Sequence, residues 1–246
     1  MKPEKYFLKN KDDKYRDFTS KLLLTIPYES IIGVRLPIIK KYAKEYIKDE
    51  ESKIFLETLP HKYLEENLLH GYLISLKKDI NEVIDLLDKF LPYVDNWSVC
   101  DTIKPSIVKK HPEEFLKHIR KWIKSKEEYR VRFSVVSLLT FYLDDNFTDE
   151  INELVLNINR EEFYINMARA WYFSFALIKQ YDKTIYIFKD KLLDKWTNNK
   201  SIQKARESYR ISNSIKEELL KYKMWYNYIV HRRKHVRIKK RFKILL

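Results

Sequence analysis

The chain has 246 residues, of which 45% are hydrophobic, and it carries 49 Lys and Arg against 35 Asp and Glu. This length and composition allow a substantial core, which argues against disorder for most of the chain. Only two glycines, Gly33 and Gly71, and seven prolines occur, too few for the tight turns and bulges of an all-β protein. We therefore expect an all-α fold.

Cysteine, histidine and glycine usage excludes several classes of site. The only cysteine, Cys100, cannot form an internal disulfide and suits a reducing, cytoplasmic compartment. With no paired histidine in view, it is interpreted as a small buried residue. His231 and His235 lie four residues apart without a third ligand, so no metal is expected. Two isolated glycines cannot form a phosphate-binding loop, and no cofactor is expected.

Apolar runs do not indicate a membrane protein. No basic N-terminal segment precedes an apolar stretch, and no run of about 18 uncharged apolar residues occurs. We therefore expect neither a signal peptide nor a membrane span, and no membrane partner.

Apolar residues recur at spacings of three and four in successive blocks, which is the pattern of amphipathic helices. Pro37 and Pro112 fit the first turn of a helix, and Thr148 followed by two acidic residues fits a helix start. Pro105 is expected to end the helix before it. The predicted helices are 12–26, 36–48, 51–59, 62–77, 80–92, 96–104, 112–124, 127–143, 148–157, 161–179, 182–195, 200–211 and 214–223.

The predicted helices follow one another through short breaks without a long linker. This arrangement favours a superhelical array of antiparallel helix pairs over a compact bundle, with residues 1–223 forming one domain. Such arrays curve, and one helix of each pair lines a concave surface. We expect a concave basic groove able to follow a duplex.

The excess positive charge is concentrated near the C-terminus. Residues 231–246 contain eight Lys and Arg and no acid, so that 41 basic and 35 acidic residues remain before them. We assign residues 224–246 to a basic C-terminal tail. A solvated arm, contact with nucleic acid and contact with an acidic membrane all stay open as interpretations, and no functional argument rests on the tail.

Trp97 and Asp101 lie four residues apart and therefore share one helical face. A carboxylate beside an indole suits a cation, and a basic chain attracts a polyanion carrying one. Arg132 and Trp171 follow at intervals of 35 and 39 residues, each about one helical repeat, so we expect the four side chains to converge. Core packing of the tryptophans and ordinary surface or paired charges remain open.

These residues belong to a longer series of segments in a consistent order. The series is Gly33–Pro37, the Trp-x-x-x-Asp pattern of Trp97 and Asp101, Lys110–Glu113 leading to Lys121–Ile123, Arg132, Ala170–Trp171, and Lys204–Glu207. Over most of residues 15 to 215 the chain resembles the AlkD-like family of alkylpurine DNA glycosylases, which are built on HEAT-like helical repeats. The chain departs from the family pattern at Leu24, where the resemblance places a tyrosine.

The resemblance implies specific roles for these residues. Asp101 would be the catalytic carboxylate, Trp97 and Trp171 the aromatic walls beside the lesion, and Arg132 a residue that contacts the DNA backbone. The implied activity is hydrolysis of the N-glycosidic bond of cationic N3- or N7-alkylated purines in duplex DNA, by a monomer that needs no cofactor. Further candidate phosphate contacts are Arg35, Lys204, Arg206 and Arg210.

Two interpretations from other classes remain beside this one. The chain also fits a non-catalytic HEAT-repeat DNA-binding protein that keeps the groove without turnover. A helical-repeat scaffold for protein interactions is the third, and in it the tryptophans would simply belong to the core.

Overall fold

The computed structural model describes residues 1–225. The predicted basic tail therefore lies outside the described residues, apart from Met224 and Trp225. Residues 1–225 form 14 α-helices and three 3₁₀-helices, with no β-strand among them. The prediction of an all-α fold is confirmed. No helix in this part of the chain is long and apolar enough to cross a membrane.

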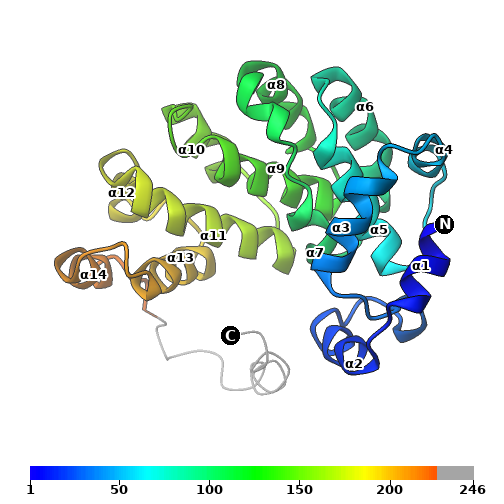
Figure 1. The fold of residues 1–246 in the computed structure, drawn as a ribbon. Helices are drawn as coiled ribbons and strands as arrows, with labels where there is room; N and C mark the ends of the chain where they lie inside the picture. The colour runs from blue at the N-terminus through cyan, green and yellow to red at the C-terminus, as the bar shows by residue number, and fades with distance from the viewer. Residues whose placement is uncertain (226–246) are drawn as a thin grey trace.

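Figure 1 shows a curved array of helix pairs. The helices α3, α5, α7, α9, α11 and α13 stack side by side along the inside of the curve, and their partners α4, α6, α8, α10, α12 and α14 form the outer row. This is the predicted helical-repeat array. The helices are α1 (Pro3–Lys9), α2 (Asp13–Leu22), α3 (Leu36–Tyr46), α4 (Glu51–Glu57), α5 (Leu64–Leu76), α6 (Ile80–Phe90), α7 (Trp97–Thr102), α8 (Pro112–Trp122), α9 (Glu128–Phe141), α10 (Asp149–Leu156), α11 (Phe163–Lys179), α12 (Tyr181–Lys189), α13 (Lys195–Glu207) and α14 (Asn213–Leu220), with 3₁₀-helices η1 (Tyr28–Ser30), η2 (Leu91–Tyr93) and η3 (Ser106–Lys110).

The predicted helix ends agree with the structure except at a few positions. Pro37 and Pro112 lie in the first turns of α3 and α8, and α7 ends at Thr102, shortly before Pro105. Thr148 precedes α10 as predicted, but its side chain makes no capping hydrogen bond. Periodicity did not predict α1. It also predicted an end of α12 that is six residues late and a start of α13 that is five residues late. That helix begins where the Asp194 carboxylate accepts the backbone N–H of Thr197 at 2.9 Å.

Buried polar side chains join neighbouring helix pairs. The amide nitrogen of Asn152, in α10, donates to the Lys183 carbonyl at 2.9 Å, and its oxygen accepts the hydroxyl of Tyr172 at 2.9 Å. Trp122, at the end of α8, donates its indole N–H to Asp88 of α6 at 2.7 Å. Because these buried groups have partners, they fix the pairs without the cost of an unsatisfied polar atom.

A buried carboxylate fixes the loop before α3. Glu65 belongs to α5 and is buried. Its carboxylate accepts the backbone N–H groups of Ile32 at 3.0 Å, Gly33 at 2.7 Å and Val34 at 3.1 Å. Gly33 has φ +93°, and a Cβ there would lie 2.6 Å from the Asp12 carbonyl oxygen. The loop therefore needs both the carboxylate and the glycine, and it holds the start of α2 through the bond from Asp12 N–H to the Gly33 carbonyl at 2.9 Å.

Replacing this carboxylate by an amide is expected to destabilise the fold. In Glu65→Gln, one acceptor oxygen and one NH₂ group would face three N–H donors, which leaves donors unsatisfied and costs about 2 to 4 kcal/mol. Urea unfolding of the full chain measures the loss. Glu66→Gln is the matched control, because Glu66 accepts the Tyr63 N–H outside this loop and the glutamine oxygen can accept it as well. Equal losses of stability in the two variants would contradict the role of Glu65 in fixing the loop before α3.

Candidate functional site

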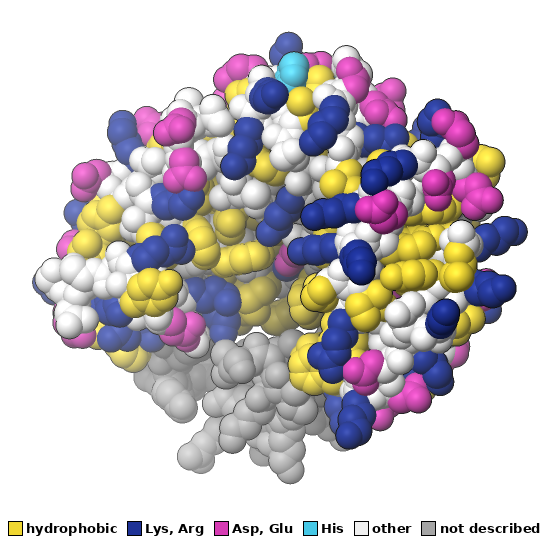
Figure 2. All heavy atoms as spheres, in the orientation of Figure 1, with side chains coloured by type: hydrophobic (Ala, Val, Ile, Leu, Met, Phe, Trp, Pro, Cys, Tyr) yellow, Lys and Arg dark blue, Asp and Glu magenta, His cyan; other side chains and the backbone are white. Residues whose placement is uncertain are grey.

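A cavity of about 490 Å³ opens on the inner row of helices. It is lined from α7, α9, α11 and α13 by Trp97, Arg132, Phe163, Tyr164, Met167, Trp171, Lys200, Lys204 and Glu207. Figure 2 shows the hollow of the array with Lys, Arg and hydrophobic side chains along its sides. Residues separated by one helical repeat in the sequence therefore meet at one place.

An ion pair lies behind the cavity wall. Arg132 donates from Nε to Asp101 Oδ1 at 2.9 Å and from Nη2 to Oδ2 at 2.6 Å. Its Nη1 donates to the carbonyl oxygen of Tyr164 at 2.7 Å. The guanidinium is buried, and the Asp101 side chain is 17% exposed. One side chain thus joins α7, α9 and α11 through a bidentate, charge-assisted contact.

The electrostatics of this pair favour the charged form of Arg132. Burial opposes the charge of Arg132, but the hydrogen bonds and the negative charge of Asp101 outweigh it and raise the pKa of Arg132. Each carboxylate oxygen accepts one N–H from Arg132 and retains a lone pair. Asp101 is therefore the structural partner of Arg132 and keeps some accepting capacity, but it is not among the residues that line the cavity.

Trp97 and Trp171 form aromatic walls. Both are half-buried, pack on one side against the core and line the cavity. Phe163 and Tyr164, at the start of α11, add two more rings, and Tyr164 lies 5.8 Å from the ring of Tyr129. Indole faces attract cations and stack on planar rings. The aromatic wall thus suits a flat group and attracts positive charge at its ring faces, whereas Arg132, Lys200 and Lys204 make other parts of the lining cationic.

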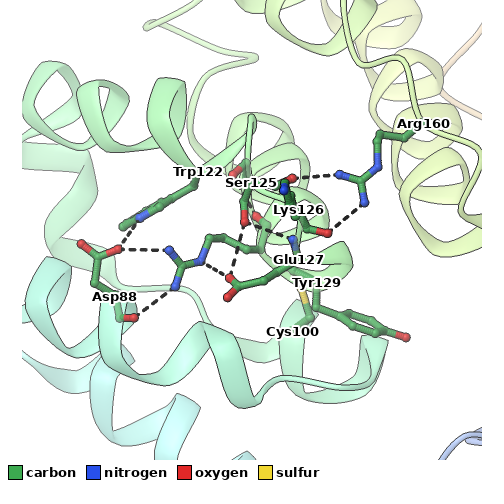
Figure 3. Close-up of polar contacts among 10 residues, drawn as sticks. Asp88, Cys100, Trp122, Ser125, Lys126, Glu127, Tyr129 and Arg160 are labelled. Carbon is green, nitrogen blue, oxygen red and sulfur yellow. Dashed lines mark hydrogen bonds and ion pairs between the residues drawn. The ribbon is translucent and has the colours of Figure 1, made fainter.

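Arg160 fixes the beginnings of α9 and α11 relative to each other. Its guanidinium donates to the backbone carbonyls of Ser125 at 2.8 Å and Lys126 at 3.0 Å, in the loop before α9 (Figure 3). It also pairs with Glu162, directly before α11. The helix starts that carry Arg132 and Tyr164 are therefore held in a defined register.

Asp194 and Arg169 anchor α13 to α11. Arg169, buried in α11, donates to Asp194 at 3.1 Å and to Asn166 at 2.9 Å. The same Asp194 caps α13. This anchor positions Lys200 and Lys204, which lie four residues apart and share one face of the helix.

The four predicted phosphate contacts lie in different surroundings. Only Lys204 lines the cavity. Arg35 pairs with Asp12 at 2.9 Å near α2, and Arg210 lies 5.0 Å over the ring of Phe175. Arg206 donates to the Lys216 carbonyl at 3.0 Å and so connects α13 to α14.

The sequence analysis missed several lining residues. Phe163, Tyr164 and Met167 were not singled out, although Met167 and Trp171 have the spacing of one helical face. Lys200 was missed as well, and Glu207 was named only as the end of the Lys204–Glu207 segment, without a role. The four-residue spacing of Lys200 and Lys204 was the available signal. Cys100 is fully buried, as predicted, and burial raises the pKa of its thiol well above the ordinary value.

Metal ligation has no support in the described part of the chain. Within residues 1–225, no group of three or more His, Cys, Asp or Glu side chains is arranged to hold a metal ion. The chemistry of the cavity is thus that of a carboxylate, a guanidinium, two lysines and aromatic rings.

Comparison with known proteins identifies the family. No curated protein matches the chain. The sequence matches the family model of the DNA alkylation repair enzyme over residues 14–185. This segment runs from α2 into α12, contains Trp97, Asp101, Arg132 and Trp171, and covers more than half of the chain. The chain belongs to the family of DNA alkylation repair enzymes.

Proposed function

We propose that this protein is a DNA glycosylase that hydrolyses the N-glycosidic bond of purines alkylated at N3 or N7 in duplex DNA. The observation that carries the proposal is that Trp97 and Trp171, from separate helix pairs, line one cavity together with Arg132, whose buried guanidinium holds the Asp101 carboxylate behind the lining. Membership of a DNA alkylation repair family supports DNA as the substrate. One chain supplies the whole cavity, so the proposal requires no second subunit.

The chemistry needs few groups. A purine alkylated at N3 or N7 is already cationic and leaves as a neutral molecule, so no general acid is required. Bond cleavage builds positive charge on the sugar, which a carboxylate stabilises, or the carboxylate orients the attacking water. Asp101 has free lone pairs for either task, and Arg132 holds its orientation.

In the proposed complex, different residues of the protein contact the damaged base and the DNA backbone. The faces of Trp97 and Trp171 would attract the cationic base by about 0.5 to 2 kcal/mol each. Lys204 is proposed to contact a phosphate, together with Arg132, Arg35, Arg206 and Arg210, although each arginine already has a protein partner. Such contacts make affinity fall with salt and depend little on sequence.

A second candidate function is non-catalytic binding of alkylated DNA. It is favoured by one observation: both oxygens of Asp101 already accept hydrogen bonds from Arg132, as in a purely structural ion pair. The two functions differ in whether base is released, so a single assay of methylated duplex DNA separates them.

Asp101→Asn is expected to slow base release by about 100-fold or more, the usual effect of losing one transition-state charge contact. Duplex affinity should stay nearly unchanged, because phosphate contacts determine it. Chromatography of bases released from methylated duplex DNA measures the first quantity, and fluorescence anisotropy the second. Full activity in the variant would refute the role assigned to the carboxylate.

Because Arg132 is buried, Asp101→Asn also weakens an ion pair, and a matched control is needed. Glu150→Gln alters a pair of the same geometry outside the cavity, where Arg120 Nε and Nη2 donate to the two carboxylate oxygens at 2.6 and 2.8 Å. It should retain base release. Both variants are assayed below their thermal midpoints, and an equal loss in both would assign the effect to folding.

Trp171→Leu tests the aromatic wall. Losing one cation–π contact of about 0.5 to 2 kcal/mol should reduce release of cationic 7-methylguanine by about 2- to 30-fold. Single-turnover release from methylated duplex measures it. Tyr209→Leu is the control, because Tyr209 is 95% exposed and outside the cavity lining. Unchanged release in Trp171→Leu would remove this indole from the proposal.

A further inference from the structure

The α13 side of the cavity holds an amine and a carboxylate that the proposed base release does not need for its chemistry. Lys204 and Glu207 are three residues apart on one face of α13, and both line the cavity that also contains Arg132 and the two indoles. Lys204 is half-buried, and among residues 1–225 it forms no ion pair. A lysine held in this way is a candidate nucleophile.

The environment disfavours the charged form of this amine relative to a free lysine. Burial and the neighbouring charge of Lys200 lower the pKa of Lys204, and the charge of Arg132 adds to this, while Glu207 opposes it. More of the amine is then unprotonated near neutral pH, and only this form attacks a carbonyl carbon.

We propose that Lys204 gives the protein a second activity, cleavage of the DNA strand at an abasic site through an imine between its Nζ and the sugar. The inference rests on the proposed function in one respect, since hydrolysis at Asp101 would leave the abasic sugar in this cavity. The substrate class is an abasic deoxyribose in duplex DNA.

The steps balance without an oxidant or reductant. The abasic sugar opens to an aldehyde at C1′, and the Lys204 nitrogen adds to that carbon. The oxygen then leaves as water, with one proton from the nitrogen and one from solvent, to give an iminium. A carboxylate, for which Glu207 is placed, then takes a proton from C2′. The electron pair forms a C2′–C3′ double bond, the C3′–O bond breaks, and the 3′ phosphate leaves with its electrons. Hydrolysis of the imine returns the lysine.

Lys204 is a better candidate than Lys200 on the same face. Lys200 donates to the side-chain oxygen of Gln203 at 3.3 Å, which engages its amine. Lys204 lies near enough to Arg132 for the arginine charge to lower its pKa, and Arg132 contacts Asp101. Both lysines line the cavity with Arg132, but only the amine of Lys200 is engaged by a side-chain hydrogen bond.

The test uses full-length protein and duplex DNA with one preformed abasic site, so that base release is bypassed. Sodium borohydride reduces an imine to a stable bond, and we expect a borohydride-dependent protein–DNA complex whose cross-linked peptide maps to Lys204. Without borohydride, the strand should be cut on the 3′ side of the abasic site. Lys204→Arg keeps the charge but not the nucleophile, and should lower trapping by about tenfold or more.

The controls separate chemistry from binding and folding. Lys189→Arg changes an exposed lysine of the outer helix α12 and should trap as wild type does. Lys204→Met keeps the aliphatic stem and is a second variant, in case the larger arginine side chain disturbs α13. Anisotropy and thermal unfolding check binding and folding in each variant, and the mapped peptide of the wild type decides the assignment if both variants unfold.

The result that overturns the inference is either no trapped complex or a cross-link that maps away from Lys204, including to lysines outside the described residues. Undiminished trapping in a folded Lys204→Arg variant also overturns it. Base release from methylated DNA is measured in parallel. Release without trapping leaves the glycosylase standing and removes the lyase, whereas trapping without release does the reverse.

Discussion

The bidentate contact between Asp101 and Arg132 is the interaction on which the site depends. A buried guanidinium is stable only when its charge and donors are matched, and here the carboxylate and the Tyr164 carbonyl match them. Because its partners belong to different helices, the same contact sets the spacing of α7, α9 and α11. The cavity is thus present without DNA, and for the proposed glycosylase this is the condition under which fixed charges stabilise a transition state most effectively.

This contact also limits what the carboxylate can do. A carboxylate paired with Arg132 presents less net negative charge to a developing cation than an isolated carboxylate does. In the proposed reaction, Asp101 would therefore contribute more through its fixed position than through its charge. The rest of the lining divides the cavity. Indoles from α7 and α11 suit the base, whereas Lys200 and Lys204 on α13 suit the phosphates or sugar beside it. One cavity can therefore attract both a cationic base and the anionic DNA backbone, because each would contact a different wall.

Sequence periodicity predicted helices such as α6 and α8 because each buries one apolar face, whereas α9 of the inner row is apolar and buried on nearly all sides. It failed where that signal is weak: α1 is short, and α13 buries Thr197, Asn198 and Ser201 in place of apolar residues. The near-constant repeat length brought Trp97, Arg132 and Trp171 together. The partner of Asp101 could not be derived in this way, because side-chain pairing depends on how helices from different repeats pack, and spacing alone does not contain that information.

The family match ends at residue 185, before α13 begins. The family match therefore covers the cavity walls from α7, α9 and α11. It does not include α13, whose contribution depends on the residues of this chain alone. That helix is held by Asp194 and Arg169, and by the bond from the Asn198 amide to the Tyr222 carbonyl at 3.0 Å. None of these contacts uses Lys204. The anchoring of α13 and the chemistry it offers to the cavity are therefore carried by different side chains, which allows the chemistry to change without loss of the wall.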